Sequence, residues 1–325
     1  MSDPAAGPPP RADPRPRADP RPRADPRQAS ARHVLIVTST IMVALVVLAA
    51  ACLGVAVAKY LARPAAHVET VSPAVARAEA ASRRLAATWV THEVGHADVV
   101  ACDAQMCAAL KADGFPSRSL VVLGQASTYP LKSAVVVVTQ AIRDLFGSSF
   151  TSNYAPAVLA AFDSADASIT VRVIAPEGAA AYQAQFGTDL KARKSAGSAL
   201  VQTPGITVSA EAKKQLLAGQ PDARLLLAIA SVASPQPVDI LGFGNIGPGA
   251  DPAIPLRFAD LAESDPAAGK AGRDYVRALR AVLGAVPAQY RPTIATVHLP
   301  DGQTVLRIEF TAPTPLTLLV APTQN

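Results

Sequence analysis

The chain is poor in aromatic residues and has no dense run of basic ones beyond its N-terminal tail. Its 325 residues include one Trp, six Tyr and eight Phe, which argues against the stacking surface that single-stranded nucleic acid requires. Residues 1–33 hold seven Arg and four Asp, whereas the remaining chain has 23 basic and 21 acidic residues. No phosphate-binding face is therefore indicated, and we expect no nucleic-acid partner.

Cysteine is also scarce, with only Cys52, Cys102 and Cys107. The last two are too few for a structural zinc site, and their spacing is not that of a redox C-x-x-C motif. Within one helix their Cα atoms would lie roughly 8 Å apart, too far for a disulfide. If Cys102 instead ends a strand and Cys107 lies in the following helix, a short loop can close. We expect this disulfide in an extracytoplasmic compartment; the alternative is two free thiols.

Apart from one His-Glu-x-x-His match, common catalytic motifs are missing. The sequence has no G-x-S-x-G elbow, no Walker loop and no other grouping of His with a carboxylate. We therefore expect no catalytic residues and no cofactor, and a binding protein rather than an enzyme.

The N-terminal tail consists largely of a repeat, RADPRP, over residues 11–27. Proline recurs so often that neither a helix nor a sheet ladder can propagate. We expect residues 1–33 to form a disordered cytoplasmic tail that acts as a basic spacer. The alternative is a ligand for a proline-recognition domain or for anionic lipid headgroups.

Residues 34–58 contain no charged side chain. As a helix this segment would be about 37 Å long, more than the hydrocarbon core of about 30 Å requires. A cleaved signal peptide has a shorter apolar region. Residues 48–52 resemble a lipoprotein cleavage site, but further apolar sequence follows them. We expect one transmembrane helix over 34–58, with the lipid bilayer as its partner.

Flanking charges predict the orientation of this helix. Six Arg lie within 20 residues on its N-terminal side, against Lys59, Arg63 and Arg77 on the other. The positive-inside rule then places the N-terminus in the cytoplasm and the C-terminal domain outside it. The sequence thus predicts a single-pass protein of the plasma membrane and cell envelope.

The extracytoplasmic part alternates short apolar runs with helical patterns, which is typical of α/β structure. We expect two α/β lobes with largely parallel sheets, 59–176 and 177–312, and a C-terminal tail, 313–325. The expected strands are 99–102, 120–123, 134–139, 169–174, 206–208, 238–243, 294–299 and 304–310, the last two forming a hairpin. The expected helices are 72–94, 104–112, 142–146, 155–162, 179–200, 210–218, 224–233 and 273–283.

Several residues of the first lobe resemble a known extracytoplasmic module. They are Trp89-Val90, the run VVACD at 99–103, Ala109-Leu110 and residues 114–116, 130–143 and 162–173. Over about 84–175, the chain resembles the soluble domain appended to some membrane glycosyltransferases of high-GC Gram-positive bacteria. As a whole it is similar to uncharacterised single-pass membrane proteins of such bacteria. The resemblance implies an envelope location and supplies no catalytic residues.

The sharpest motif is His92-Glu93-Val94-Gly95-His96. On a helix, two His four residues apart can bind Zn²⁺ while the Glu polarises a bound water. However, Gly95 and the strand that follows leave little helix, and no third ligand is apparent. We expect no metal; the alternative is a zinc-dependent metallohydrolase with His92 and His96 as ligands and Glu93 as base. Its third ligand would be sought among Asp98, Cys102 and Asp103.

A second motif, Gly242-Phe243-Gly244-Asn245-Ile246-Gly247, matches G-x-G-x-x-G after a strand. A dinucleotide site needs a helix to begin at the third Gly. Pro248, Pro252 and Pro255 prevent such a helix, so we interpret this segment as a glycine loop.

We therefore expect a membrane-anchored protein with a non-catalytic binding or envelope-assembly role. Its partner would be a cell-wall glycan or another membrane protein. Parallel sheets bind ligands at the carboxyl ends of their strands. Any ligand site is accordingly expected near Asp103, Gly124 and Gln140.

Overall fold

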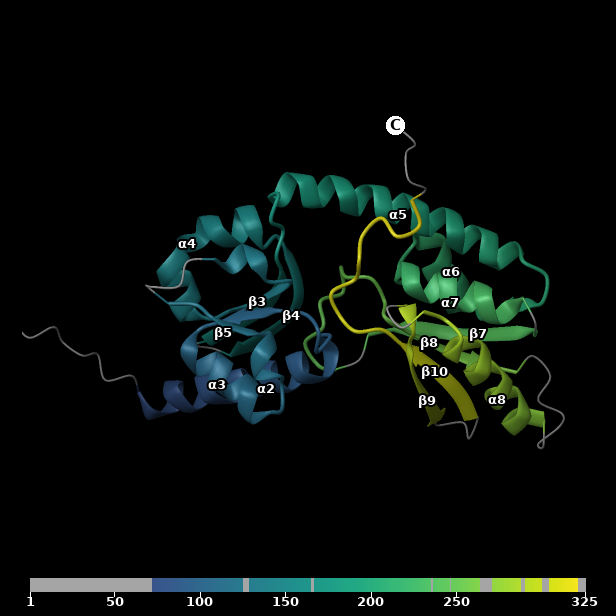
Figure 1. Cartoon of the computed structure of the whole chain (residues 1–325), viewed down its shortest axis with the longest axis horizontal. Helices are drawn as coiled ribbons and strands as arrows, with labels where there is room; N and C mark the ends of the chain where they lie inside the picture. The colour runs from purple at the N-terminus through teal and green to yellow at the C-terminus, as the bar shows by residue number, and fades with distance from the viewer. Residues whose placement is uncertain are drawn as a thin grey trace, which may run out of the picture. The chain divides into compact units, whose positions relative to one another are not determined.

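The computed structural model describes residues 72–124, 129–164, 167–234, 236–245, 247–263, 271–287, 290–299 and 304–320 (Figure 1). All of these residues belong to one compact unit, Val71–Asn325. The basic tail and the expected transmembrane helix over 34–58 lie outside them. None of the helices in the described part has the length and apolar composition needed to cross a bilayer.

The described part is an α/β structure with seven α-helices and two mixed five-stranded sheets. The first sheet has the order β2-β1-β3-β5-β4. Its strands are β1 (Val100–Cys102), β2 (Leu120–Val122), β3 (Val135–Val138), β4 (Ala157–Ser164) and β5 (Ala167–Val173). Its helices are α2 (Pro73–Glu93), α3 (Ala104–Ala112) and α4 (Gln140–Tyr154), with short 3₁₀ turns at Ser117–Ser119 and Pro130–Lys132.

Helices cover the first sheet on both faces, with α2 and α3 on one and α4 on the other (Figure 1). Val135 and Val137 of β3 join the core formed with α2 and α3. Val136 and Val138 join the core formed with α4. This explains why β3 is a continuous β-branched run: both of its faces are buried.

The expectation of largely parallel sheets is wrong. In the first sheet, β1 is parallel to β2 and β3, but β5 is antiparallel to both β3 and β4. β4 and β5 follow one another closely in the chain, and a short connection requires an antiparallel pair. The expected helix over 155–162 is wrong too, because most of these residues form β4. Its Ala-rich sequence favours a helix locally, but pairing with β5 overrides that preference.

The second sheet has the order β6-β7-β8-β10-β9. Its strands are β6 (Ile206–Val208), β7 (Val238–Gly244), β8 (Phe258–Ala262), β9 (Thr293–His298) and β10 (Thr304–Glu309). Its helices are α5 (Ala179–Gln202), α6 (Ala210–Ala218), α7 (Ala223–Ala233) and α8 (Ala271–Gly284). β6 is parallel to β7, and the other pairings are antiparallel. The expected hairpin is confirmed, with β9 and β10 paired antiparallel.

The two faces of this sheet differ in polarity. Ile240, Leu261 and Leu306 face a core shared with the helices. The opposite face carries Arg307 and Asp260, which lie opposite each other on β10 and β8 and form an ion pair at 2.7 Å. Such alternation is typical of antiparallel strands with helices on one side.

A loop of the second sheet forms main-chain hydrogen bonds with a strand of the first sheet. The loop between β7 and β8 pairs with the outer edge of β4. The Ala161 amide donates to the Gly249 carbonyl, and the Asp251 amide donates to the Leu159 carbonyl, both at 2.9 Å. Because this loop covers it, β4 is not a free edge strand.

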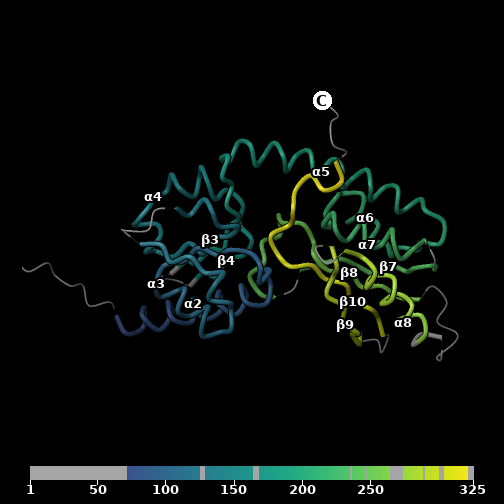
Figure 2. Tube along the Cα trace, viewed as in Figure 1, coloured from purple at the N-terminus to yellow at the C-terminus, as the bar shows by residue number. Residues whose placement is uncertain are grey.

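The segment after β10 runs beside α5, as the yellow part of the trace shows (Figure 2). Thr314 Oγ1 donates to Asp222 Oδ2 at 2.8 Å, and the Thr317 amide donates to Asp189 Oδ1 at 3.1 Å. Both carboxylates are fully buried. Residues 313–317, expected to begin a tail, are therefore tied into the fold.

Candidate functional site

The His-Glu-x-x-His motif does not form a zinc-binding helix. Helix α2 ends at Glu93, and Val94 is extended (φ −95°, ψ 138°), so His92 and His96 do not share a helix face. His96 is exposed, lies 3.0 Å from the Thr91 carbonyl through Nε2, and packs edge-on against Phe115. Among the described residues, no three His, Cys, Asp or Glu side chains could hold a metal together. The geometry thus gives the zinc-hydrolase alternative no support.

Glu93 instead forms a buried ion pair with Arg257, which directly precedes β8 of the second sheet. The Arg257 Nη2 donates to Glu93 Oε2 at 2.7 Å, and the two residues are 1% and 3% exposed. Burial raises the pKa of Glu93, and the adjacent guanidinium opposes this rise. Arg257 also donates to the Glu93 carbonyl at 3.2 Å and lies over the Trp89 ring. Glu93 therefore joins the two sheets and faces no metal site.

Two of the three glycines of the G-x-G-x-x-G match, Gly244 and Gly247, are closely packed. A Cβ on Gly244 would lie 2.5 Å from the Phe258 ring, and one on Gly247 (φ +85°) would lie 3.0 Å from the Trp89 ring. Only glycine tolerates such approaches and such a backbone conformation. The described residues between Gly244 and β8 form turns and no helix, so this loop lacks the geometry of a dinucleotide site.

Cys102 and Cys107 are joined by a disulfide, with their Cα atoms 5.4 Å apart. Cys102 ends β1 and Cys107 lies in α3. Asp103, between them, caps α3 by accepting from the Gln105 and Met106 amides at 2.9 and 3.0 Å. The turn from strand to helix is therefore held by both a covalent bond and a cap.

Two of the three residues expected beside a ligand crevice at the strand ends, Asp103 and Gln140, are hydrogen-bonded within the fold. Asp103 Oδ2 accepts from Thr139 Oγ1 at 2.5 Å, so the ends of β1 and β3 do meet. The Gln140 side-chain amide donates to Asp144 at 2.7 Å. Gly124 directly precedes residues that the structure does not describe. Asp103 and Gln140 thus have partners within the fold, and a ligand site at this edge stays a prediction.

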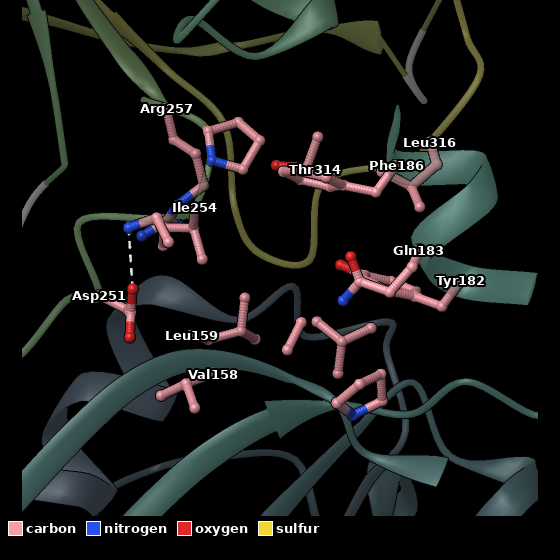
Figure 3. Close-up of a pocket in the computed structure, with 15 residues that line it drawn as sticks. Val158, Leu159, Tyr182, Gln183, Phe186, Asp251, Ile254, Arg257, Thr314 and Leu316 are labelled. Carbon is pink, nitrogen blue, oxygen red and sulfur yellow. Dashed lines mark hydrogen bonds between the residues drawn. The ribbon is translucent and has the colours of Figure 1, made fainter. Parts of the chain in front are cut away.

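A cavity of about 310 Å³ lies elsewhere, between β4, α5, the β7–β8 loop and the C-terminal segment (Figure 3). This volume is at the lower end of small-molecule sites. Its walls are mainly apolar, and a few polar side chains reach it. The lining residues that the argument below uses are Val158, Leu159, Tyr182, Gln183, Asp251 and Arg257.

A β-bulge in β4 shapes one wall of this cavity. Val158 lies opposite Arg172, but Ala160 lies opposite Val171, so Leu159 is an additional residue in the ladder. A regular strand would turn successive side chains to opposite faces. The bulge redirects them, and both Val158 and Leu159 line the cavity.

The β7–β8 loop forms the opposite wall. Its pairing with β4 holds Asp251 in place, and Asp251 Oδ1 accepts from the Ala253 amide at 2.8 Å, the dashed line in Figure 3. A Cβ on Gly249 (φ +91°) would lie 2.8 Å from the Ala161 carbonyl oxygen. This glycine therefore permits the close approach that places Asp251 and Ile254 beside the cavity.

Helix α5 supplies the aromatic wall. Tyr182 and Phe186 are four residues apart on one helix face, and their rings stack with centroids 6.3 Å apart. Burial, and then the negative charge of Asp189, raise the pKa of the Tyr182 phenol. The phenol is therefore protonated at neutral pH and can donate a hydrogen bond. Gln183, also at the cavity, is exposed.

A second cavity, of about 380 Å³, adjoins the first. The two share four lining residues: Val173, Tyr182, Thr314 and Leu316. The second cavity is also lined by Glu177 and Gln185. Tyr182 thus stands between two spaces of similar size.

Sequence reasoning missed this site, although two signals pointed to it. Arg257 is the single charged residue within the apolar run 252–259, which suggests a buried and paired cation. Tyr182 and Phe186 recur at helical spacing in a chain that has few aromatic residues. Neither signal shows that these residues come together, because that depends on contacts between distant segments.

Comparison with known proteins finds no matching family model, no similar curated protein and no similar solved structure.

Proposed function

We propose that the chain is a membrane-anchored extracytoplasmic protein whose α/β part binds a ligand without transforming it. The cavity between β4 and α5 carries the binding role. The location rests on the uncharged segment 34–58 and is supported by the disulfide between Cys102 and Cys107, since such bonds persist in oxidising compartments.

The composition of the cavity supports binding over catalysis. Ligand sites are typically apolar with a few placed polar groups, and here Tyr182, Gln183 and Asp251 supply them. No Ser, Cys or His lines either cavity, and the Thr314 hydroxyl donates to buried Asp222. The two linings therefore hold no activated nucleophile with a neighbouring base.

The binding role can be tested by identifying what the protein retains. Full-length protein is extracted from its host membrane, denatured, and the released small molecules are identified by mass spectrometry. We expect one species in about equimolar amount with wild-type protein. It should be lost in Val158→Trp, which fills the cavity from β4, because a bound molecule and an indole cannot share this volume.

Val122→Trp is the matched control. Val122 is 48% exposed on edge strand β2 and lines neither cavity, so the variant should retain the same species. Circular dichroism must show that both variants are folded. A wild-type protein that retains no small molecule, or equal retention by Val158→Trp, would contradict the proposal.

A further inference from the structure

We infer that the two cavities form one elongated site and that its ligand is a neutral chain bearing hydroxyl groups, which is the chemistry of an oligosaccharide. This inference rests on the proposed binding role. It is carried by the adjacency of the cavities, by their charge balance, and by the neutral hydrogen-bonding groups and apolar side chains of their linings.

The adjacency implies a ligand with repeated units. Because Tyr182 and Leu316 line both cavities, a ligand that passes Tyr182 enters both. Each cavity has a volume suited to a small molecule. A chain of similar units therefore fits this arrangement better than a single compact ligand does.

The charge balance favours a neutral ligand. Arg257 is the only cationic residue in either lining, and Glu93 already compensates it at 2.7 Å. Asp251 and Glu177 add negative charge, so an anionic ligand would meet repulsion and no uncompensated cation. Asp251 in turn interacts electrostatically with Arg172, which weakens its attraction for a cationic ligand.

The hydrogen-bonding groups suit hydroxyl and carbonyl oxygens. Gln183 lines the first cavity and Gln185 lines the second, and both side chains are exposed. The amides of Gln183 and Gln185 and the Tyr182 phenol can exchange further hydrogen bonds with hydroxyl groups.

The apolar walls suit the C–H faces of sugar rings. Tyr182 and Phe186 present stacked rings, and Leu159 and Ile254 are apolar side chains that also line the first cavity. Flat apolar surfaces next to a few polar groups can hold a ring that is apolar on its faces and polar at its edge.

The test uses calorimetric titration of the full-length chain in a sugar-free detergent. The probes are chitobiose, chitotetraose and anionic tetragalacturonate. We expect chitotetraose to bind about tenfold more tightly than chitobiose, because only the longer chain reaches both cavities, and at least about tenfold more tightly than tetragalacturonate.

Variants assign the binding to this site. Tyr182→Ala should weaken chitotetraose binding about tenfold, and Gln183→Ala, at an exposed position, should weaken it without risk to the fold. Tyr129→Ala is the matched control, since Tyr129 is 63% exposed and lines neither cavity. Its affinity should equal that of the wild type.

Any of four results would overturn the inference. The first two are that neither chitin oligomer binds saturably and that the two lengths bind with equal affinity. The others are that tetragalacturonate binds more tightly and that Tyr182→Ala and Gln183→Ala keep wild-type affinity. If neither oligosaccharide binds but Val158→Trp still loses a retained molecule, the binding role stands and the ligand class is wrong.

Discussion

At the scale of single residues, several charged side chains are buried and paired with each other. Glu93 and Arg257 are separated by 164 positions in the chain yet pair at 2.7 Å. Asp222 pairs with Arg224 at 2.6 Å and also accepts from Thr314. Such pairs add little net stability when intact, but removal of one partner leaves the other charge buried and unpaired.

We predict that Arg257→Met lowers the free energy of unfolding by about 3–5 kcal/mol, because Glu93 is left buried without its partner. Adding Glu93→Gln should recover part of this loss. Urea titration followed by circular dichroism measures both changes. The control is Lys214→Met, which breaks an exposed pair with Glu211 and should cost less than about 1 kcal/mol. Equal costs in the two variants would show that the buried pair is unimportant.

A second prediction concerns pH. Burial raises the pKa of Glu309, the negative charge of Glu93 adds to the rise, and Arg257 and Arg307 oppose it. Burial likewise raises the pKa of Asp98. A group with a raised pKa in the folded state binds protons more tightly than in the unfolded chain. Its contribution to stability is present at low pH and is lost as the pH rises through the folded value.

Glu309→Gln should therefore reduce the fall in stability as the pH is raised from about 5 to about 8. The window begins just above the ordinary glutamate value of 4.5. Melting temperatures across this range provide the measurement. Glu211→Gln, at an exposed position of α6, should keep the wild-type slope. If Glu309→Gln steepens the slope, the ionised carboxylate is stabilised in the fold, contrary to this argument.

At the scale of elements, helix α5 depends on close contact with α6. A Cβ on Gly197 would overlap the Leu216 carbonyl oxygen and lie 2.9 Å from its carbon. These are backbone atoms that cannot move independently of α6. The same helix carries Gly187, where a Cβ would meet nothing within 4 Å. The two glycines thus have different roles in one element.

We predict opposite effects for two identical substitutions in α5. Gly197→Ala should destabilise by about 1–3 kcal/mol through overpacking. Gly187→Ala should stabilise by about 0.5–1 kcal/mol, because Ala has the higher helix propensity and no clash arises. Urea titrations of the two variants provide the comparison. Stabilisation by both would mean that α5 and α6 are not packed as closely as the structure indicates.

At the scale of the whole molecule, the proposed membrane topology predicts which part faces the outside of the cell. If the arginine bias around 34–58 sets the orientation, a protease added to intact cells should digest the α/β part and spare the N-terminal tail. Epitope tags at both ends report this on immunoblots, and permeabilised cells, in which both tags should be lost, provide the control.

Loss of the N-terminal tag from intact cells would show that the orientation is the opposite one, with the N-terminus outside. It would also remove the basis for a persistent disulfide, since Cys102 and Cys107 would then face a reducing compartment. Non-reducing mass spectrometry of the same material tests this consequence independently.

The sequence by itself determined most of the elements, because their signals are local. The expected bounds of 104–112 and 210–218 match α3 and α6, whose N-caps Asp103 and Ser209 can be recognised in the sequence. The β9–β10 hairpin follows from two alternating runs around Pro300-Asp301-Gly302. The β-branched composition of β3 likewise predicts a strand buried on both faces.

Only the tertiary structure decided the strand directions, the identity of β4 and the candidate site. Ala157 to Phe162 have helical composition, yet β5 and the loop at Gly249 hold them as a bulged strand. The motif around His92 left a zinc site open as the alternative interpretation, yet Arg257, 164 residues away, pairs with Glu93. Tyr182 and Asp251 line one cavity, which depends on the pairing of the β7–β8 loop with β4. Strand pairing and burial depend on contacts between residues that are distant in the sequence, and local sequence patterns do not determine these contacts.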